Sequence, residues 1–160
     1  EPYRRQRQMC IRDSNMSEAE REEFLDRFSE ESDRTLVAFG IMGGIFGEGI
    51  DLKNDRLIGA IVVGTGLPQI SNERTILKDY YDAENGCGFD YAFRYPGINK
   101  VLQAAGRVIR TTEDTGVILL LDERFWQREY DLLYPREWSD RKPCNIANVG
   151  KLVADFWEQI

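Results

Sequence analysis

The chain has 160 residues, of which 42% are hydrophobic and 31% are charged, so it can bury a core and does not have the composition of a disordered segment. Its net charge of -7 argues against a surface that attracts nucleic acid everywhere, because nonspecific affinity comes from neutralising phosphates. The chain has no histidine and its three cysteines are far apart, which excludes histidine acid–base chemistry and predicts no metal site.

The sequence contains no pattern of a signal peptide and no run of about eighteen apolar residues. Cysteines without a pairing pattern are by default reduced thiols of a cytoplasmic protein. We therefore expect a cytoplasmic protein with no membrane partner.

The first fourteen residues, EPYRRQRQMCIRDS, show no hydrophobic period and contain four arginines. The string MCIRDS resembles translated sequencing adapter. We expect residues 1–16 to be a non-native or disordered leader. The alternative interpretation is a basic arm that binds nucleic acid.

Downstream, helices and strands alternate. Ser17 with Glu20 three positions later forms a capping box and predicts a helix over residues 17–32. Apolar, β-branched runs predict buried parallel strands over residues 35–42, 57–64 and 116–121. Polar and amphipathic patterns predict helices over residues 72–84, 99–110, 126–133 and 148–160. This order indicates an α/β fold.

The first strand runs into a glycine-rich segment, LVAFGIMGGIFGEGIDL, over residues 36–52. Glycines allow tight turns and close approach of backbone amides to a ligand, and open α/β sheets bind ligands beyond the carboxyl ends of their strands. The segment is therefore a candidate ligand edge, although a purely structural turn also needs glycines.

The stretch VLQAAGRVIR, residues 101–110, is the most informative part of the chain. If it is helical, Gln103, Arg107 and Arg110 share one face, and two guanidiniums point the same way. Guanidinium is always charged and forks toward phosphate oxygens, so a fixed pair suits a polyphosphate. The alternative is a solvated helix face with ordinary ion pairs.

In this order, GEGIDL, QAAGRVIR and GVILLLDERF resemble motifs V and VI of superfamily 2 helicases of the DinG and XPD type, and the resemblance covers residues 17–138. It implies an α/β, RecA-like three-layer domain with a mostly parallel sheet, incomplete at its N-terminus, with residues 139–160 as a helical extension. By this resemblance Arg107 and Arg110 are catalytic arginine fingers that reach the phosphates of ATP. Further residues implied in ATP binding and in its coupling to DNA are Gln103, Gly106, Glu48, Gly49 and Asp51. Where such helicases usually carry Ser or Trp before the Glu-Gly pair, this chain has Gly47.

The chain has no GxxxxGK[ST] phosphate loop and no DExH-like acidic pair, so it does not build an ATP site by itself. The resemblance implies that a missing N-terminal motor domain holds ATP and Mg, and that the partner is single-stranded DNA. We therefore expect an N-terminally truncated fragment of a helicase. On its own it would be inactive, expose an apolar sheet edge and dissolve poorly.

Other functions stay open at this point. A dinucleotide-binding oxidoreductase would need GxGxxG after its first strand, whereas this chain has GxxGGxxGxG. A carboxylate-metal enzyme would use Glu48, Asp51 and Asp122. A non-catalytic nucleic-acid-binding or protein-interaction module is the main alternative. Alternating aromatic residues precede the arginine run and could stack on the bases of a single strand: Phe89, Tyr91, Phe93 and Tyr95.

Overall fold

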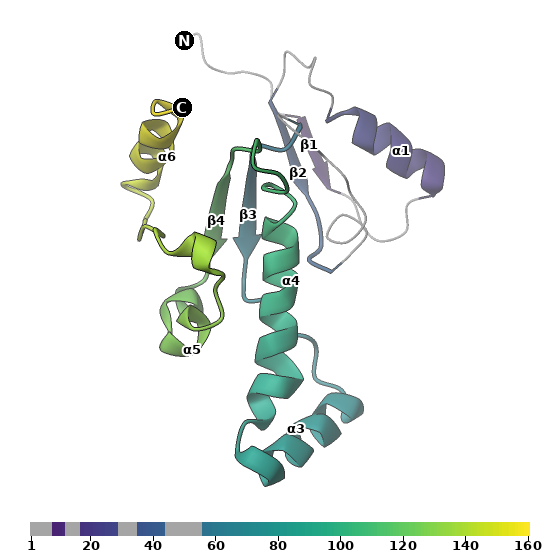
Figure 1. Cartoon of the computed structure of the whole chain (residues 1–160). Coiled ribbons are helices and arrows are strands. Elements are labelled where there is room, and N and C mark those ends of the chain that lie inside the picture. The colour runs from purple at the N-terminus through teal and green to yellow at the C-terminus, as the bar shows by residue number, and fades with distance from the viewer. Residues whose placement is uncertain (1–7, 12–16, 29–34, 44–55) are drawn as a thin grey trace. The chain divides into compact units, whose positions relative to one another are not determined.

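The computed structural model describes residues 8–11, 17–28, 35–43 and 56–160 of the chain. It divides the chain into two compact units, Glu1–Phe125 and Trp126–Ile160. The first unit contains the strands and the long helices, and the second contains short helices (Figure 1). The division falls after Phe125, whereas we expected the main domain to end at residue 138. The expected boundary stays a prediction.

The described strands form two parallel pairs. Strand β1 (Gln8–Ile11) pairs with β2 (Leu36–Phe39), and β3 (Gly59–Val63) pairs with β4 (Val117–Leu121). Parallel strands joined through helices are the pattern of an α/β domain. The predicted fold class is confirmed, with a partial, parallel sheet of the kind found in RecA-like domains.

The strand β1 lies within residues 1–16, the expected leader. Its four residues pair in register with β2, from Gln8 opposite Leu36 to Ile11 opposite Phe39. The segment shows no alternation of apolar and polar residues, so its sequence does not predict a strand. These four residues form a strand, and the expectation of a non-native or disordered leader over residues 1–16 stays a prediction.

Helix α1 (Glu18–Asp26) begins at the predicted capping box. The Glu20 carboxylate accepts the Ser17 amide at 2.8 Å, and the Ser17 hydroxyl accepts the Glu20 amide at 3.4 Å. The helix ends at Asp26, so the prediction that it reaches residue 32 is wrong. The Arg56 guanidinium donates to the carbonyl oxygens of Leu25 and Phe28 at 3.3 and 2.9 Å, which satisfies acceptors left open at the helix end.

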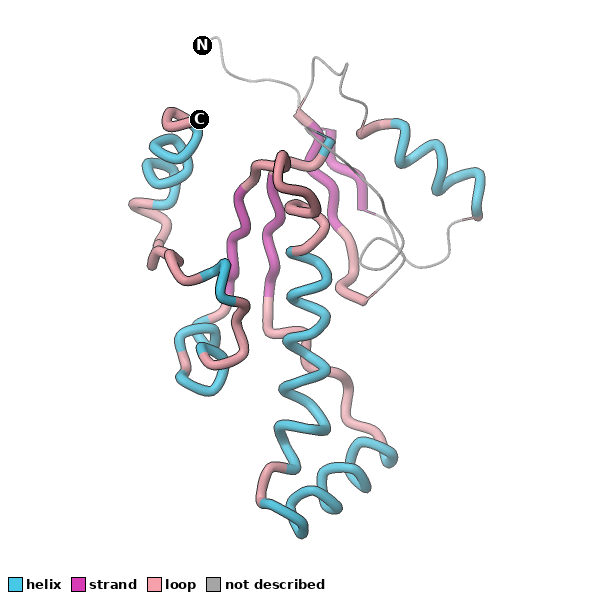
Figure 2. Tube along the Cα trace, in the orientation of Figure 1, coloured by secondary structure: helices cyan, strands magenta, loops and turns pink. Residues whose placement is uncertain are grey.

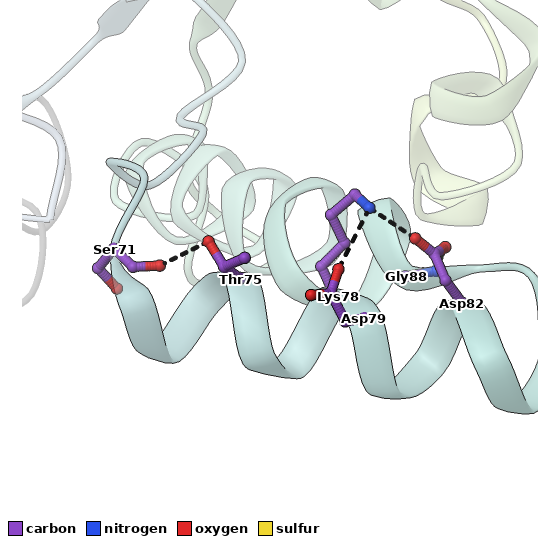
Figure 3. A network of polar contacts seen from close by, with 6 residues as sticks. All are labelled: Ser71, Thr75, Lys78, Asp79, Asp82 and Gly88. Atoms are coloured by element: carbon purple, nitrogen blue, oxygen red, sulfur yellow. Dashed lines mark hydrogen bonds and ion pairs between the residues drawn. The ribbon is translucent and has the colours of Figure 1, made fainter.

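Helix α3 (Asn72–Asn85) has nearly the predicted bounds, between the Ser71 cap and Gly86, whose φ of 73° ends the helix. Figure 3 shows the polar contacts along it. Lys78 pairs with Asp82 at 2.6 Å, and the other Asp82 oxygen accepts the Gly88 amide at 2.8 Å. Asp82 thereby ties the end of α3 to the start of the next helix.

The next helix begins earlier than predicted. A π-helix (η2, Asp90–Arg94) runs without a break into α4 (Tyr95–Ala105), as the tube in Figure 2 shows. Pro96 has no N–H to give to the Ala92 carbonyl one turn before it. The Arg74 guanidinium of α3 donates to that carbonyl instead, at 3.0 Å. This contact between helices explains how a helix starting well before residue 99 tolerates a proline.

The core of the first unit lies between α4 and β3, which contact each other (Figure 1). It contains the buried side chains of Val62, Ile98, Val101, Ala105 and Val108. Alternate residues of β3 point the other way, so Ile61 and Val63 are 62% and 70% exposed. We expected parallel strands covered on both faces, and the described residues cover one.

The second unit consists of short elements. Helix α5 (Arg128–Asp131) is followed by a 3-10 turn (Arg136–Trp138) and by α6 (Val149–Trp157), close to the predicted tail helices. Arg141 organises the middle of the unit: it pairs with Asp131, donates to the Trp138 carbonyl at 2.8 Å and lies 4.5 Å from the Tyr134 ring centre. In the described part of the chain, no helix is long and apolar enough to cross a membrane.

Candidate nucleotide and nucleic-acid site

The arginine run does not form one helix. Helix α4 ends at Ala105, so Gln103 lies on an exposed position of the helix and Arg107 lies in the turn that follows. The Gly106 amide still bonds to the carbonyl one full turn back, that of Leu102, at 2.8 Å. The next two amides bond only three residues back, at 3.2 and 3.0 Å, which tightens and stops the helix. The prediction of a helix through Arg110 is therefore wrong at its end.

A carboxylate holds the segment beyond the turn. Asp114 accepts the backbone amides of Arg110 and Thr111 at 2.9 and 2.7 Å. These two bonds replace the helical hydrogen bonds that the Arg110 and Thr111 amides would otherwise donate. Arg110 is thus carried by a capped loop with an exposed side chain, whereas Arg107 is half-buried.

Buried Val108 anchors the same segment between the two arginines. Its side chain is 3% exposed and lies against Gly116, at the start of β4. Two fixed points, Val108 and the Asp114 cap, therefore hold the backbone that carries Arg107 and Arg110. The predicted shared helix face of Gln103, Arg107 and Arg110 does not form, because α4 ends at Ala105 and the two arginines follow it in a turn and a capped loop. Their role, with that of Gly106, stays a prediction.

The predicted site residues of the glycine-rich segment, Glu48, Gly49 and Asp51, lie outside the described residues. The turn that precedes them is described. Gly43 there has a φ of 84°, and Met42 reaches Gly66, the glycine that follows β3. The backbone segments after β2 and after β3 are thus neighbours at the carboxyl ends of both strands.

The turn after β3 packs directly on the first turn of α4. Thr65 lies in it and is 1% exposed, and its hydroxyl has no hydrogen-bond partner among the described residues. A methyl group on Gly66 would lie 2.7 Å from the Gly97 carbonyl oxygen, so the two backbones touch. This contact fixes the loop that continues into Pro68 and Gln69.

Asp122, a candidate metal ligand of the alternative carboxylate-metal enzyme, is held by its neighbour. The Arg124 guanidinium donates to both of its oxygens at 2.8 and 2.7 Å, and the Arg124 amide donates at 2.9 Å. These bonds lower the pKa of the Asp122 carboxyl. A carboxylate with both oxygens engaged is a poor ligand, and within the described ranges no cluster of three metal-ligating side chains occurs.

The aromatic residues before the arginine run are helical. Phe93 is buried, Phe89 and Tyr91 are partly exposed, and Tyr91 stacks on Tyr81 of α3 with ring centres 4.0 Å apart. Packing between helices therefore uses much of the surface that base stacking would need. Helical spacing predicts the contact between Tyr91 and Tyr95, whereas no sequence pattern indicates the contact with Tyr81, because Tyr81 belongs to another helix.

Comparison with known proteins gives one family. Residues 2–141 match the family described as the helicase C-terminal domain. The matched range contains the glycine-rich segment and the turn after α4.

Individual helicases are similar over most of the chain. The chain is 33% identical over 137 residues to the ATP-dependent DNA helicase XPD of Sulfolobus acidocaldarius, covering 79% of this chain and 22% of that protein. It is 32% identical over 101 residues to the ATP-dependent DNA helicase DinG of Photobacterium profundum, covering 62% and 14%. It is 30% identical over 113 residues to regulator of telomere elongation helicase 1 of Bos taurus, covering 65% and 9%. The chain thus spans at most 22% of the length of these relatives.

Proposed function

The chain belongs to the helicase C-terminal domain family, of the DinG and XPD type, and we propose that it is the second RecA-like motor domain of an ATP-dependent DNA helicase. In this proposal Arg107 and Arg110 meet the phosphates of ATP, which is bound between this domain and a preceding motor domain. The substrate is single-stranded DNA. A cytoplasmic location belongs to the same proposal.

The observation that carries the proposal is the anchored segment after α4. Two guanidiniums are placed three residues apart on a backbone fixed by buried Val108 and by the Asp114 cap. Guanidinium keeps its charge at every physiological pH and binds phosphate oxygens with two parallel hydrogen bonds. A fixed pair stabilises the negative charge that develops on a phosphoryl group during its transfer.

The other residues have supporting roles. Gln103 is exposed on the last turn of α4, and Gly106 directly precedes Arg107. Both residues would contact the nucleotide beside the arginines. Glu48, Gly49 and Asp51 would couple nucleotide binding to the DNA. ATP, when bound, supplies the phosphoanhydride bond whose hydrolysis drives the motor, and Mg would be held by carboxylates of the preceding domain.

The test is substitution of the arginines in the longer protein that contains the preceding domain. We expect Arg107→Ala or Arg110→Ala to reduce DNA-stimulated ATP hydrolysis by about 10³ to 10⁵, roughly 4 to 7 kcal/mol, with little change in folding. An exposed ion pair accounts for at most about 1 kcal/mol. Arg128→Ala, an exposed arginine of α5, is the matched control and should hydrolyse ATP normally. Parental rates for both Arg107 and Arg110 variants would show that they are not arginine fingers.

A second candidate is a non-catalytic nucleic-acid-binding or protein-interaction module. The partly exposed rings of Tyr80, Phe89 and Tyr91 favour it, because exposed aromatic side chains bind bases and protein partners. The two functions differ in one measurement. A motor changes its affinity for DNA when nucleotide binds, whereas a simple binding module does not.

A further inference from the structure

A lysine of α4 lies across the Gly43 turn of the glycine-rich segment. A Cβ atom on Gly43 would lie 3.4 Å from both Cδ and Cε of Lys100 and 3.6 Å from its Nζ. The aliphatic stem of Lys100 therefore passes over the Gly43 turn, at van der Waals distance from the position of a Cβ atom. Gly43 itself is exposed and Lys100 is half-buried.

The Lys100 ammonium has no hydrogen bond or ion pair to any described residue. Other lysines of the chain do: Lys78 pairs with Asp82 at 2.6 Å and Lys151 with Asp155 at 2.5 Å. The chain carries 28 acidic residues, so acids are abundant. Lys100 is half-buried and has no acidic partner among the described residues, so its ammonium is available to an external anion.

The position of Lys100 separates it from the arginines. It lies at the carboxyl ends of β2 and β3, because Gly43 follows β2 and its neighbour Met42 contacts Gly66 after β3. Arg107 is seven residues further on, roughly 10 Å along the helix direction, near the start of β4. A single phosphate group does not bridge that distance, so Lys100 and Arg107 would contact different phosphate groups.

We propose that Lys100, lying over the Gly43 turn, binds a backbone phosphate of single-stranded DNA at the carboxyl ends of the strands. This rests on the DNA-binding part of the proposed function and adds a specific phosphate contact to it. Ligands of open α/β sheets bind at this edge. A single ammonium recognises phosphate as a point charge, without reading the base.

The test measures binding of the 160-residue chain to labelled oligothymidylate by fluorescence anisotropy over about 50 to 200 mM salt. We expect Lys100→Gln to weaken binding several-fold and to reduce the slope of log affinity against log salt by about 0.7, the value for one single-strand phosphate contact. The loss should be equal for oligodeoxyadenylate, because phosphate contacts are independent of sequence. Lys100→Arg should restore the slope.

Two further variants sharpen the test. Gly43→Asn keeps a residue that tolerates positive φ but places a side chain under the lysine stem, so we expect the same loss with Lys100 intact. Lys142→Gln removes one charge from an exposed lysine of the second unit and should leave the slope unchanged. In the longer protein that contains the preceding domain, a fluorescent ATP analogue should bind the parent and Lys100→Gln alike.

Equal slopes for the parent chain and Lys100→Gln would overturn the inference. An equal loss of slope in Lys142→Gln would also overturn it, because it would indicate an effect of net charge alone. So would a Lys100→Gln variant that loses affinity for the ATP analogue but not for DNA. Failure of the arginine test with a clear Lys100 effect would instead favour a DNA-binding module, so the two proposals fail separately.

Discussion

The backbones of Gly66 and Gly97 are in direct contact, one in the turn after β3 and the other in the first turn of α4. A Cβ on Gly97 would lie 2.7 Å from the Thr65 carbonyl oxygen and 3.2 Å from the Leu67 amide nitrogen. Both obstacles are backbone atoms, which do not move aside as a flexible side chain does. The contact sets how closely α4 approaches the sheet, and α4 carries Lys100 and leads to Arg107.

We predict that Gly97→Ala destabilises the chain by at least about 1 kcal/mol, although Gly→Ala in a helix normally stabilises by roughly 0.5 to 1 kcal/mol. The control is Gly150→Ala in α6, where a Cβ meets nothing within 4 Å and stabilisation is expected. Urea unfolding of both variants gives the two free energies of unfolding. Equal, stabilising effects would mean that the Gly66–Gly97 contact is looser than described.

The second prediction concerns pH. Hydrogen bonds from Arg124 lower the pKa of Asp122 below its usual value, so the folded state favours the ionised carboxylate. The stabilisation that the ionised Asp122 carboxylate gives is fully present above the pKa of aspartate in the unfolded chain, about 3.9. It is lost as the pH falls through the lower pKa of Asp122 in the folded chain. Asp122→Asn should therefore lower the free energy of unfolding at pH 7 by up to about 1 kcal/mol and have a smaller effect below about pH 3.

Asp140→Asn, at an exposed aspartate, serves as the control for this charge change. Its effect on unfolding should be small at both pH values. An Asp122→Asn effect that stays constant from neutral to acidic pH would show that the Arg124 bonds do not depend on ionisation of the carboxylate.

The third prediction concerns the uncovered face of β3. Ile61 and Val63 are 62% and 70% exposed, while Val62 between them is 5% exposed. Exposed apolar strand faces promote association. Replacing Ile61 and Val63 together with Thr should increase the monodisperse fraction in light scattering and change the free energy of unfolding by less than about 1 kcal/mol, since threonine keeps strand preference.

Val62→Thr is the internal control, because it places a hydroxyl in the core and should cost about 1 to 3 kcal/mol of stability. If the unmodified chain is already monodisperse and melts cooperatively, the expectation of poor solubility is wrong and another part of the molecule covers this face.

Local sequence determined those features whose atoms are close along the chain. The capping box of Ser17 and Glu20, the bounds of α3 between Ser71 and Gly86, and the parallel strands at residues 59–63 and 117–121 follow from nearby residue types. Short-range hydrogen bonds and apolar patterning decide them. The sequence motifs also led correctly to the helicase family, because they depend on residue order rather than on packing.

Tertiary structure alone decided the rest. Arg74, from another helix, donates to the Ala92 carbonyl that Pro96 leaves without a donor, and Lys100 lies over Gly43 because the turn after β2 meets α4 in space. No periodicity or local propensity encodes either contact, since each joins residues from separate elements. The strand ends that Lys100 reaches follow from how α4 packs on β3, and packing is a property of the folded chain.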